Sequence, residues 1–188
     1  MDVLFGALAL VCAYLMGSFP SAYFVAKKAR NLDIRKVGSG NVGSTNAVRN
    51  LGLPLGVLVF IADVLKGLIP ALLCKWLSGE TLGILAGLAA SLGHVFPVWL
   101  QFKGGKAVAT ALGVALALFP LLGLMGLAMW AITLVLSDCV AVASVAAAAA
   151  LSAMVLVRVD PLSYKIGYLL IALLIIWKHR SNFVKLKK

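Results

Sequence analysis

Long apolar runs separated by short polar segments dominate this chain and limit what it can fold into. They cover residues 3–26, 51–77, 81–102, 107–136, 139–157 and 162–177. A helix needs about 20 apolar residues to cross a bilayer, and lipid offers its backbone polar groups no partner outside the helix. We therefore expect an all-α integral membrane protein, with residues 1–188 forming a single membrane-embedded domain.

Composition supports the membrane class. Hydrophobic residues make up 63% of the chain and charged residues 12%, against roughly 25% charged in soluble domains. The first run, residues 3–26, lacks a basic start and an obvious cleavage site. We interpret it as a retained span and not as a signal peptide.

The fourth run, residues 107–136, leaves the number of crossings open. It is about 30 residues long, with Phe119-Pro120 near its middle, whereas one crossing needs roughly 20 residues. A proline inside an apolar run either kinks the helix or begins a new one. A single crossing here gives six spans in total, and two crossings give seven.

The positions of the basic residues decide between six and seven membrane spans, because loops rich in Lys and Arg stay on the cytoplasmic side. Thirteen of the 17 fall in three clusters, at 27–49, at 103–106 and after the last run. Seven spans put all three on one side. We predict seven transmembrane helices, an outside N-terminus and a cytoplasmic C-terminus. Despite the net charge of +11, this clustering indicates anionic substrates or lipids and not nucleic acid.

A polar stretch, KVGSGNVGSTNAVRNLG, joins the first cluster to the second run. Glycines permit positive φ there, and short side chains supply donors and acceptors. These side chains are Ser39, Asn41, Ser44, Thr45 and Asn46. The residues that we predict to bind substrate are the last four of these and, from the other polar segments, His94, Lys103, Gly104, Gly105 and Arg180. Ser44 or Thr45 could cap a short helix through Arg49 whose free N–H groups face an anion. A flexible loop with ordinary turn residues has the same composition, so both interpretations stay open.

The second cluster lies in FKGGKAVAT. Gly104 and Gly105 precede a predicted helix whose first turn holds Lys106, and such a loop can bind a phosphate. The stretch lacks the frame of a Walker A loop. A tight turn, with Lys103 and Lys106 as positive-inside residues, is the alternative.

Four further ionisable or amide side chains lie near the ends of the third and the last apolar runs. His94 is close to the end of the third run, where a lone histidine is more often structural than catalytic. After the last run, His179 and Asn182 are three apart on an expected helical extension, so they can point together into a site, with Arg180 between them. A basic, lipid-facing terminus is the alternative for this tail.

Within the second run, Asp63 and Lys66 are also three apart. Charged groups at that depth need partners. An internal salt bridge is the simplest interpretation of the pair.

Several chemistries are poorly supported. The chain lacks a G-x-S-x-G elbow, a His-x-x-x-x-Asp pattern and any carboxylate or histidine cluster that would hold a metal. Only six residues are acidic. We expect no metal and no cofactor, and chemistry that depends on cations, amides and hydroxyls.

Three blocks together resemble the acyl-phosphate-dependent glycerol-3-phosphate acyltransferases of bacterial membranes. They are GSGNVGSTNAVRNLG, GHVFPVWLQFKGGKAVAT and KHRSNF, about a fifth of the chain. Their order and spacing between apolar runs make the match specific. Family members continue after the third block to a glycine and a glutamate, whereas this sequence ends at LKK, so no role is carried over for that glutamate.

The resemblance implies transfer of a fatty acyl group from acyl phosphate to the 1-hydroxyl of sn-glycerol 3-phosphate. The products are lysophosphatidic acid and phosphate, in the first acylation of phospholipid synthesis. It implies a multi-pass protein of the bacterial inner (cytoplasmic) membrane with its site at the cytoplasmic face. Membrane lipid and the two substrates are the expected partners, and no obligate protein partner is evident.

The resemblance also assigns residues. It implies that Ser39 and Arg49 are essential, that Gly104, Gly105 and Lys106 bind the phosphate of glycerol 3-phosphate, and that His179 and Asn182 complete the site. Two rival classes are a small transporter of a phosphorylated anion and a structural membrane scaffold. The polar blocks collect at one face without a visible repeat, unlike the midplane sites of transporters, and a scaffold leaves those blocks unexplained.

Overall fold

The structure is a computed structural model that describes residues 3–186, and all regular elements within that range are helical. They are α1 (Val3–Ser18), α2 (Ser21–Arg30), the 3₁₀ helix η1 (Ile34–Lys36), α3 (Ser44–Leu51), α4 (Leu53–Ser78), α5 (Glu80–Val95), the 3₁₀ helix η2 (Val98–Leu100), α6 (Val108–Leu118), α7 (Pro120–Ser137), α8 (Val140–Arg158) and α9 (Leu162–Leu186).

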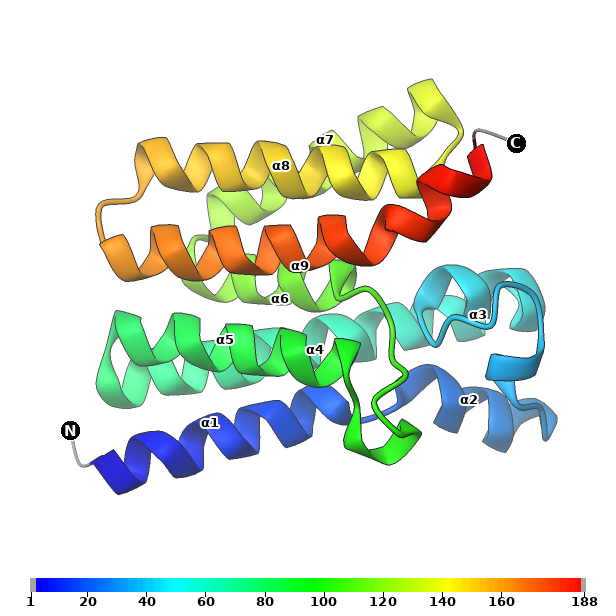
Figure 1. The fold of residues 1–188 in the computed structure, drawn as a ribbon, viewed down its shortest axis with the longest axis horizontal. Helices are drawn as coiled ribbons and strands as arrows, with labels where there is room; N and C mark the ends of the chain where they lie inside the picture. Colours follow the sequence, from blue (N-terminus) through cyan, green and yellow to red (C-terminus); the bar gives the residue numbers. More distant parts are fainter. Residues whose placement is uncertain (1–2, 187–188) are drawn as a thin grey trace.

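The long helices run side by side along the longest axis of the molecule (Figure 1). Helix α4 packs on α6, α5 on α1, and α7 on α8. Large apolar side chains such as Trp76 and Val135 point outwards, with exposed fractions of 82% and 83%. A helical bundle with an apolar outer surface confirms the predicted all-α integral membrane class.

Glycines let the helices of this bundle approach closely. A Cβ on Gly67 of α4 would lie 2.1 Å from the Thr110 carbonyl oxygen, and a Cβ on Gly113 of α6 would lie 2.0 Å from that of Val64. Helices in lipid associate through such small residues, because no hydrophobic effect drives them together there. The contact fixes α6, and hence the loop before it, against α4.

Within the described range, six helical segments are long and apolar enough to cross a membrane, and α6 is a shorter apolar helix of 11 residues. The predicted break at Phe119-Pro120 is confirmed, since α6 ends at Leu118 and α7 begins at Pro120. Two helices thus replace the fourth apolar run.

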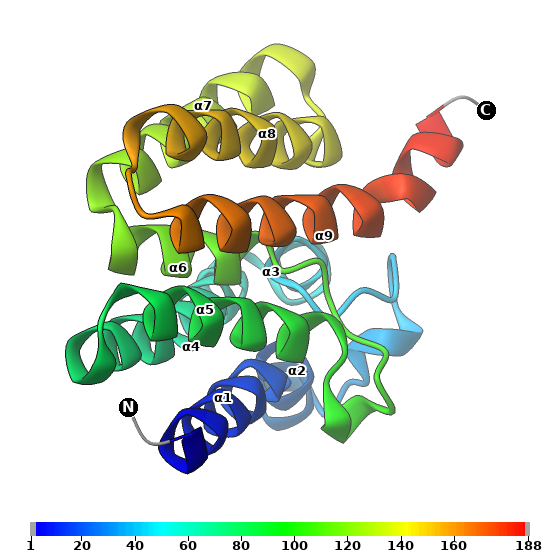
Figure 2. The ribbon, with the colours of Figure 1, turned by 60° about the vertical axis from the view of Figure 1, so that its left-hand side comes forward.

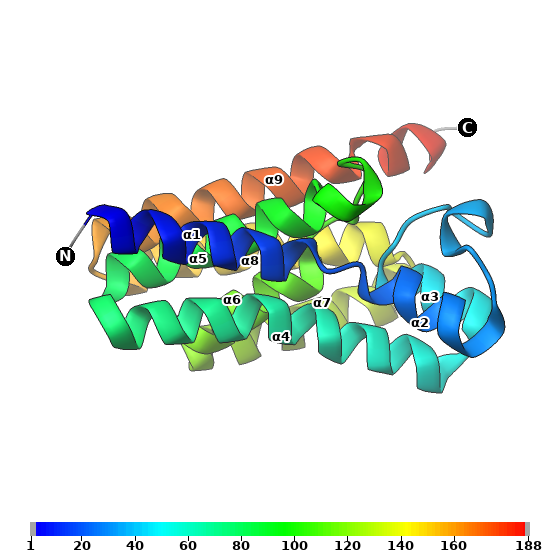
Figure 3. The same ribbon diagram turned by 90° about the horizontal axis from the view of Figure 1, so that it is seen from below.

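The first apolar run is also interrupted, which the sequence interpretation missed. Helix α1 ends at Ser18 and α2 begins at Ser21. Pro20 has no N–H to continue the helix. Residues 3–30 still form one candidate membrane span, as predicted, but the chain bends within it where it approaches the polar blocks (Figure 3).

The three polar blocks gather at one end of the bundle. Helices α2 and α3, the loop between α5 and α6, and the last turns of α9 lie at that end, whereas α1 begins at the other (Figures 1 and 2). This arrangement brings segments far apart in the sequence into one region.

Candidate active site

Asn46 organises the first polar block from inside. Its side chain is 2% exposed, and its Oδ1 accepts hydrogen bonds from the backbone N–H of Ser39 (3.0 Å) and from Nδ2 of Asn50 (3.0 Å). Its Nδ2 donates to the carbonyls of Ile34 and Val37, both at 3.2 Å. The predicted role of Asn46 was substrate binding, but the structure commits its side chain to holding the loop before α3.

The predicted short helix through Arg49 is confirmed as α3, although its cap differs. Gly43 occupies the N-cap position without a side-chain hydrogen bond, so Ser44 and Thr45 lie inside the first turn. Arg49 is exposed in the last turn, and Ser39 is exposed in the preceding loop. Asn41 is half-buried beside that loop, with its N–H directed to the Ser39 hydroxyl at 3.4 Å.

The acidic residue just before this block, Asp33, is paired with a neighbouring arginine. Asp33 accepts two side-chain hydrogen bonds from Arg35, at 2.9 and 2.8 Å. The Arg35 guanidinium thereby lowers the pKa of the Asp33 carboxyl to about 2. A group with so low a pKa is a poor proton acceptor near neutral pH.

The glycine pair of the second block is a packing element. The N–H of Gly104 donates to the carbonyl of Val95 (3.1 Å), and that of Gly105 donates to the carbonyl of His94 (3.0 Å). A Cβ on Gly105 would lie 2.1 Å from Nε2 of His94. The glycines are required because the loop lies directly on the end of α5, and both N–H groups already have backbone acceptors.

Lys106 also departs from its predicted position. It was expected in the first turn of a helix, but α6 begins at Val108 with Ala107 as its N-cap, in a left-handed conformation (φ 59°). Lys106 therefore precedes the helix. Left-handed backbone in a residue with a Cβ is costly and persists only where its surroundings fix it. The loop presents Lys106 in one defined direction.

That direction is towards the third block. The Lys106 Nζ donates a hydrogen bond to Oδ1 of Asn182 at 2.5 Å. One turn earlier on α9, His179 is 2% exposed and its Nδ1 lies 2.8 Å from the Ile175 carbonyl. A carbonyl can only accept, so Nδ1 carries a proton, which in the neutral form of the ring leaves the lone pair on Nε2. The predicted helical extension carrying these residues is confirmed.

Two predicted binding residues lie apart from this contact. Arg180 stacks on Trp177, with its guanidinium carbon 4.2 Å from the ring centroid, and donates to the Trp177 carbonyl. Lys103 is exposed in the loop before the glycine pair. The structure thus joins Lys106 with Asn182 and places Arg180 and Lys103 elsewhere on the same end.

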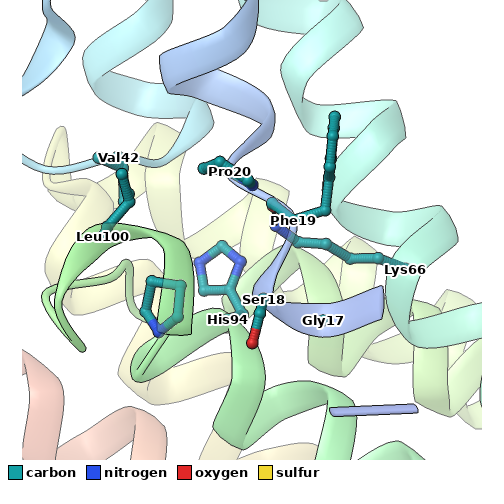
Figure 4. A pocket seen from close by; sticks show the side chains of 9 residues that line it. Gly17, Ser18, Phe19, Pro20, Val42, Lys66, His94 and Leu100 are labelled. Carbon is teal, nitrogen blue, oxygen red and sulfur yellow. Dashed lines mark hydrogen bonds between the residues drawn. The ribbon is translucent and has the colours of Figure 1, made fainter. Parts of the chain in front are cut away.

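The first and second blocks meet through apolar contacts. Val42, Ala47 and Leu100 belong to one buried cluster, so the loop before α3 packs on η2. Behind this contact is a small cavity of about 10 Å³. Ser18, Lys66 and His94 line it (Figure 4).

The predicted internal salt bridge between Asp63 and Lys66 is confirmed, with Nζ and Oδ1 2.8 Å apart. Two further polar contacts were not foreseen. Ser21 donates a hydrogen bond to Asp63 of this pair, and, separately, Tyr14 donates one to the Phe96 carbonyl at 2.6 Å. Both are polar side chains inside the first apolar run, and the Phe19-Pro20 step is the sequence signal that could have drawn attention to them.

Known proteins of one family are similar to this chain over nearly its whole length. The family model described as glycerol-3-phosphate acyltransferase matches residues 7–188. This chain belongs to that family. A glycerol-3-phosphate acyltransferase of Geotalea daltonii is 45% identical over 180 residues, covering 95% of this chain and 92% of the relative. That of Prochlorococcus marinus (strain NATL1A) is 40% identical over 184 residues, covering 95% and 93%.

Solved structures of the family have the same fold. The crystal structure of PlsY (YgiH), an integral membrane glycerol 3-phosphate acyltransferase, in its glycerol 3-phosphate form has a TM-score of 0.90 and 39% identity, covering 96% of this chain and 91% of that one. Its lysophosphatidic acid form has a TM-score of 0.91. This glycerol-3-phosphate acyltransferase family member is therefore a multi-pass membrane protein with the fold of PlsY.

Proposed function

We propose that this protein transfers a fatty acyl group from an acyl phosphate to the 1-hydroxyl of sn-glycerol 3-phosphate. The products are lysophosphatidic acid and inorganic phosphate, in the first acylation of phospholipid synthesis. Family membership supports the acceptor and the acyl transfer. The observation that carries the proposal is the contact between Lys106 and Asn182 beside His179, at the end of the bundle where the basic blocks meet.

An acyl phosphate is already an activated donor, so a covalent protein nucleophile is unnecessary. The acceptor hydroxyl oxygen bonds to the acyl carbon, and the bond from that carbon to the phosphate oxygen breaks. The enzyme has to hold two anions together and stabilise the charge that develops on the carbonyl oxygen and the leaving phosphate. The Lys106 ammonium and the Arg49 guanidinium suit this task, because charge-assisted hydrogen bonds to phosphate are strong.

Each residue of the site has a proposed role. Lys106 binds the phosphate of glycerol 3-phosphate, and Asn182 holds Lys106 in place. His179 accepts a hydrogen bond from the acceptor hydroxyl through Nε2, because its Nδ1 is directed at the Ile175 carbonyl. Ser39 and Arg49 bind the donor phosphate. The hydroxyl proton passes to a substrate phosphate, with His179 orienting the hydroxyl.

We also propose the topology. Helices α1, α4, α5, α6, α7, α8 and α9 each cross the bacterial inner membrane, with the N-terminus outside and the site at the cytoplasmic face. At 11 residues, α6 is too short for a bilayer of average thickness, so the membrane is thinned beside it. The acyl chain stays in lipid against the apolar helix surfaces, while glycerol 3-phosphate arrives from the cytoplasm.

Phosphate release by the purified protein tests the function. Detergent-purified protein is incubated with acyl phosphate, with glycerol 3-phosphate, and with both, while phosphate and lysophosphatidic acid are measured. The proposal requires equal amounts of both products, formed only when both substrates are present. Uptake of glycerol 3-phosphate into proteoliposomes without acyl transfer would instead favour a transporter of phosphorylated anions.

A further inference from the structure

One carboxylate oxygen deep in the bundle connects the helices that lead to the site. Asp63 of α4 is 1% exposed. Its Oδ1 accepts a hydrogen bond from the Ser21 hydroxyl at the start of α2, and it lies 2.8 Å from the Lys66 Nζ and 3.8 Å from Nδ1 of His94 on α5. Three helices thus converge on a single atom.

Lys66 ties this cluster to the break in the first apolar run. Its Nζ donates to the Phe19 carbonyl at 2.9 Å, at the point where Pro20 interrupts the helix. The same carbonyl accepts the backbone N–H of Ser21 at 3.0 Å. Lys66 is its second donor, so the charge pair is bonded directly to the bend between α1 and α2.

His94 ties the same cluster to the loop that carries Lys106. The His94 carbonyl accepts the N–H of Gly105 at 3.0 Å, and the His94 ring is so close that a Cβ on Gly105 would lie 2.1 Å from Nε2. The opposite side of the ring presents Nδ1, which is buried without a hydrogen bond among the described side chains, to Asp63. The imidazole therefore fills the space between Asp63 and the residue before Lys106.

We infer that Asp63 is a positioning residue for acyl transfer: with Lys66 and Ser21 it sets where His94, and through it the Gly104–Lys106 loop, lies relative to the first polar block. The inference rests on the proposed function for its kinetic consequence. A displacement of about 1 Å at a reacting centre can cost on the order of 100-fold in rate. A charge pair that only stabilises the bundle would carry no such consequence.

The test separates positioning from stability. In Asp63→Asn, Lys66 stays buried without its counter-charge, and this alone lowers stability whether or not Asp63 positions the loop. The double variant Asp63→Asn/Lys66→Met removes both charges together, and neutral replacement of a buried pair is often tolerated. Ser21→Ala, which deletes one hydrogen bond to Asp63 and no charge, is the reserve variant should the double variant not fold.

Two readouts are measured on the full-length protein in lipid nanodiscs. One is the kcat and the KM for glycerol 3-phosphate, and the other is amide hydrogen exchange of a peptide covering residues 101–107. The matched control is Ser91→Ala on α5, because the buried Ser91 hydroxyl donates its hydrogen bond within its own helix, to the Gly87 carbonyl. The control is expected to match wild type in both readouts.

We expect the double variant to regain an apparent melting temperature near that of wild type, with kcat at least 10-fold lower and loop exchange at least 10-fold faster. Ser21→Ala should speed loop exchange about threefold. Wild-type kcat and wild-type exchange in a folded double variant, or wild-type exchange in Ser21→Ala if the double variant fails to fold, would overturn the inference. If wild type itself produces no lysophosphatidic acid, the proposed function fails, while the exchange measurement still decides whether Asp63 positions the loop.

Discussion

Lys106 and Asn182 are 76 positions apart in the chain, yet the Lys106 Nζ lies 2.5 Å from Oδ1 of Asn182. The contact joins the loop before α6 to the end of α9. An amide oxygen holds an ammonium without neutralising its charge, since asparagine carries none. The lysine therefore stays cationic and is held in one place, as a phosphate-binding group requires.

Replacing Lys106 should weaken binding of glycerol 3-phosphate. A charged hydrogen bond contributes about 1.5–3 kcal/mol, so we expect Lys106→Ala to raise the KM for glycerol 3-phosphate by roughly 10- to 100-fold. Initial rates of phosphate release over a range of glycerol 3-phosphate concentrations measure this. Lys165→Ala, at the far end of α9, is the charge-matched control. An unchanged KM in a folded Lys106→Ala protein would remove Lys106 from this role.

His179 is expected to orient the acceptor hydroxyl, with the proton going to a substrate phosphate. Glutamine can still form a hydrogen bond, so His179→Gln should retain turnover, with kcat lowered by roughly 10- to 100-fold. Added imidazole should not restore it. If turnover vanished instead, and imidazole restored it in proportion to the free base, His179 would be the general base.

The glycine pair is required for packing, which predicts the effect of adding one methyl group. The Cβ of Gly105→Ala would meet the His94 ring at 2.1 Å, and overpacking of this kind costs about 1–3 kcal/mol. We expect a lower apparent melting temperature and kcat/KM reduced at least 10-fold. Gly43→Ala is the control, because its Cβ would have ordinary room, 3.7 Å from Nδ2 of Asn41. Equal stability of the two variants would contradict the packing role.

The stability of the protein should depend on the two hydrogen bonds that the Asn46 amide donates. Asn46→Asp replaces an amide that donates to two carbonyls by oxygens that only accept, and Asn46→Ala removes all its bonds. Both should lower the free energy of unfolding by about 2–6 kcal/mol, because two carbonyls lose their donor and each buried group left unpaired costs about 1–3 kcal/mol. Denaturation followed by tryptophan fluorescence measures this. Asn41→Ala should change stability little, and a similar loss there would contradict the assignment.

Some elements of the fold and of the candidate site could be predicted from the sequence, and others could not. The break at Phe119-Pro120 could be predicted, because the length of the apolar run and the positions of the basic residues are read directly from the sequence. The break at Phe19-Pro20 was missed because the surrounding residues stay apolar, and the Lys66 donor that stabilises it comes from another helix. The partners of the Gly104 and Gly105 N–H groups were likewise unpredictable, since tertiary packing on α5 supplies them.

The proposed orientation predicts which cysteines a membrane-impermeant reagent reaches in intact cells. The three free cysteines, Cys12, Cys74 and Cys139, are first replaced so that the reagent labels the introduced cysteine alone. A single cysteine at Glu80, exposed at the start of α5, should then be labelled from outside. One at Lys36, exposed in the first block, should be labelled only after the cells are opened. The reverse pattern would contradict an outside N-terminus.

A crystal structure of this protein with glycerol 3-phosphate is the most direct measurement. Because the three polar blocks meet at one end of the bundle, the phosphate should lie within hydrogen-bond distance of the Lys106 Nζ, with the 1-hydroxyl facing Nε2 of His179. A phosphate bound away from both residues, or bound near the bundle midplane between α4 and α5, would show that this end of the bundle is not the acyltransferase site.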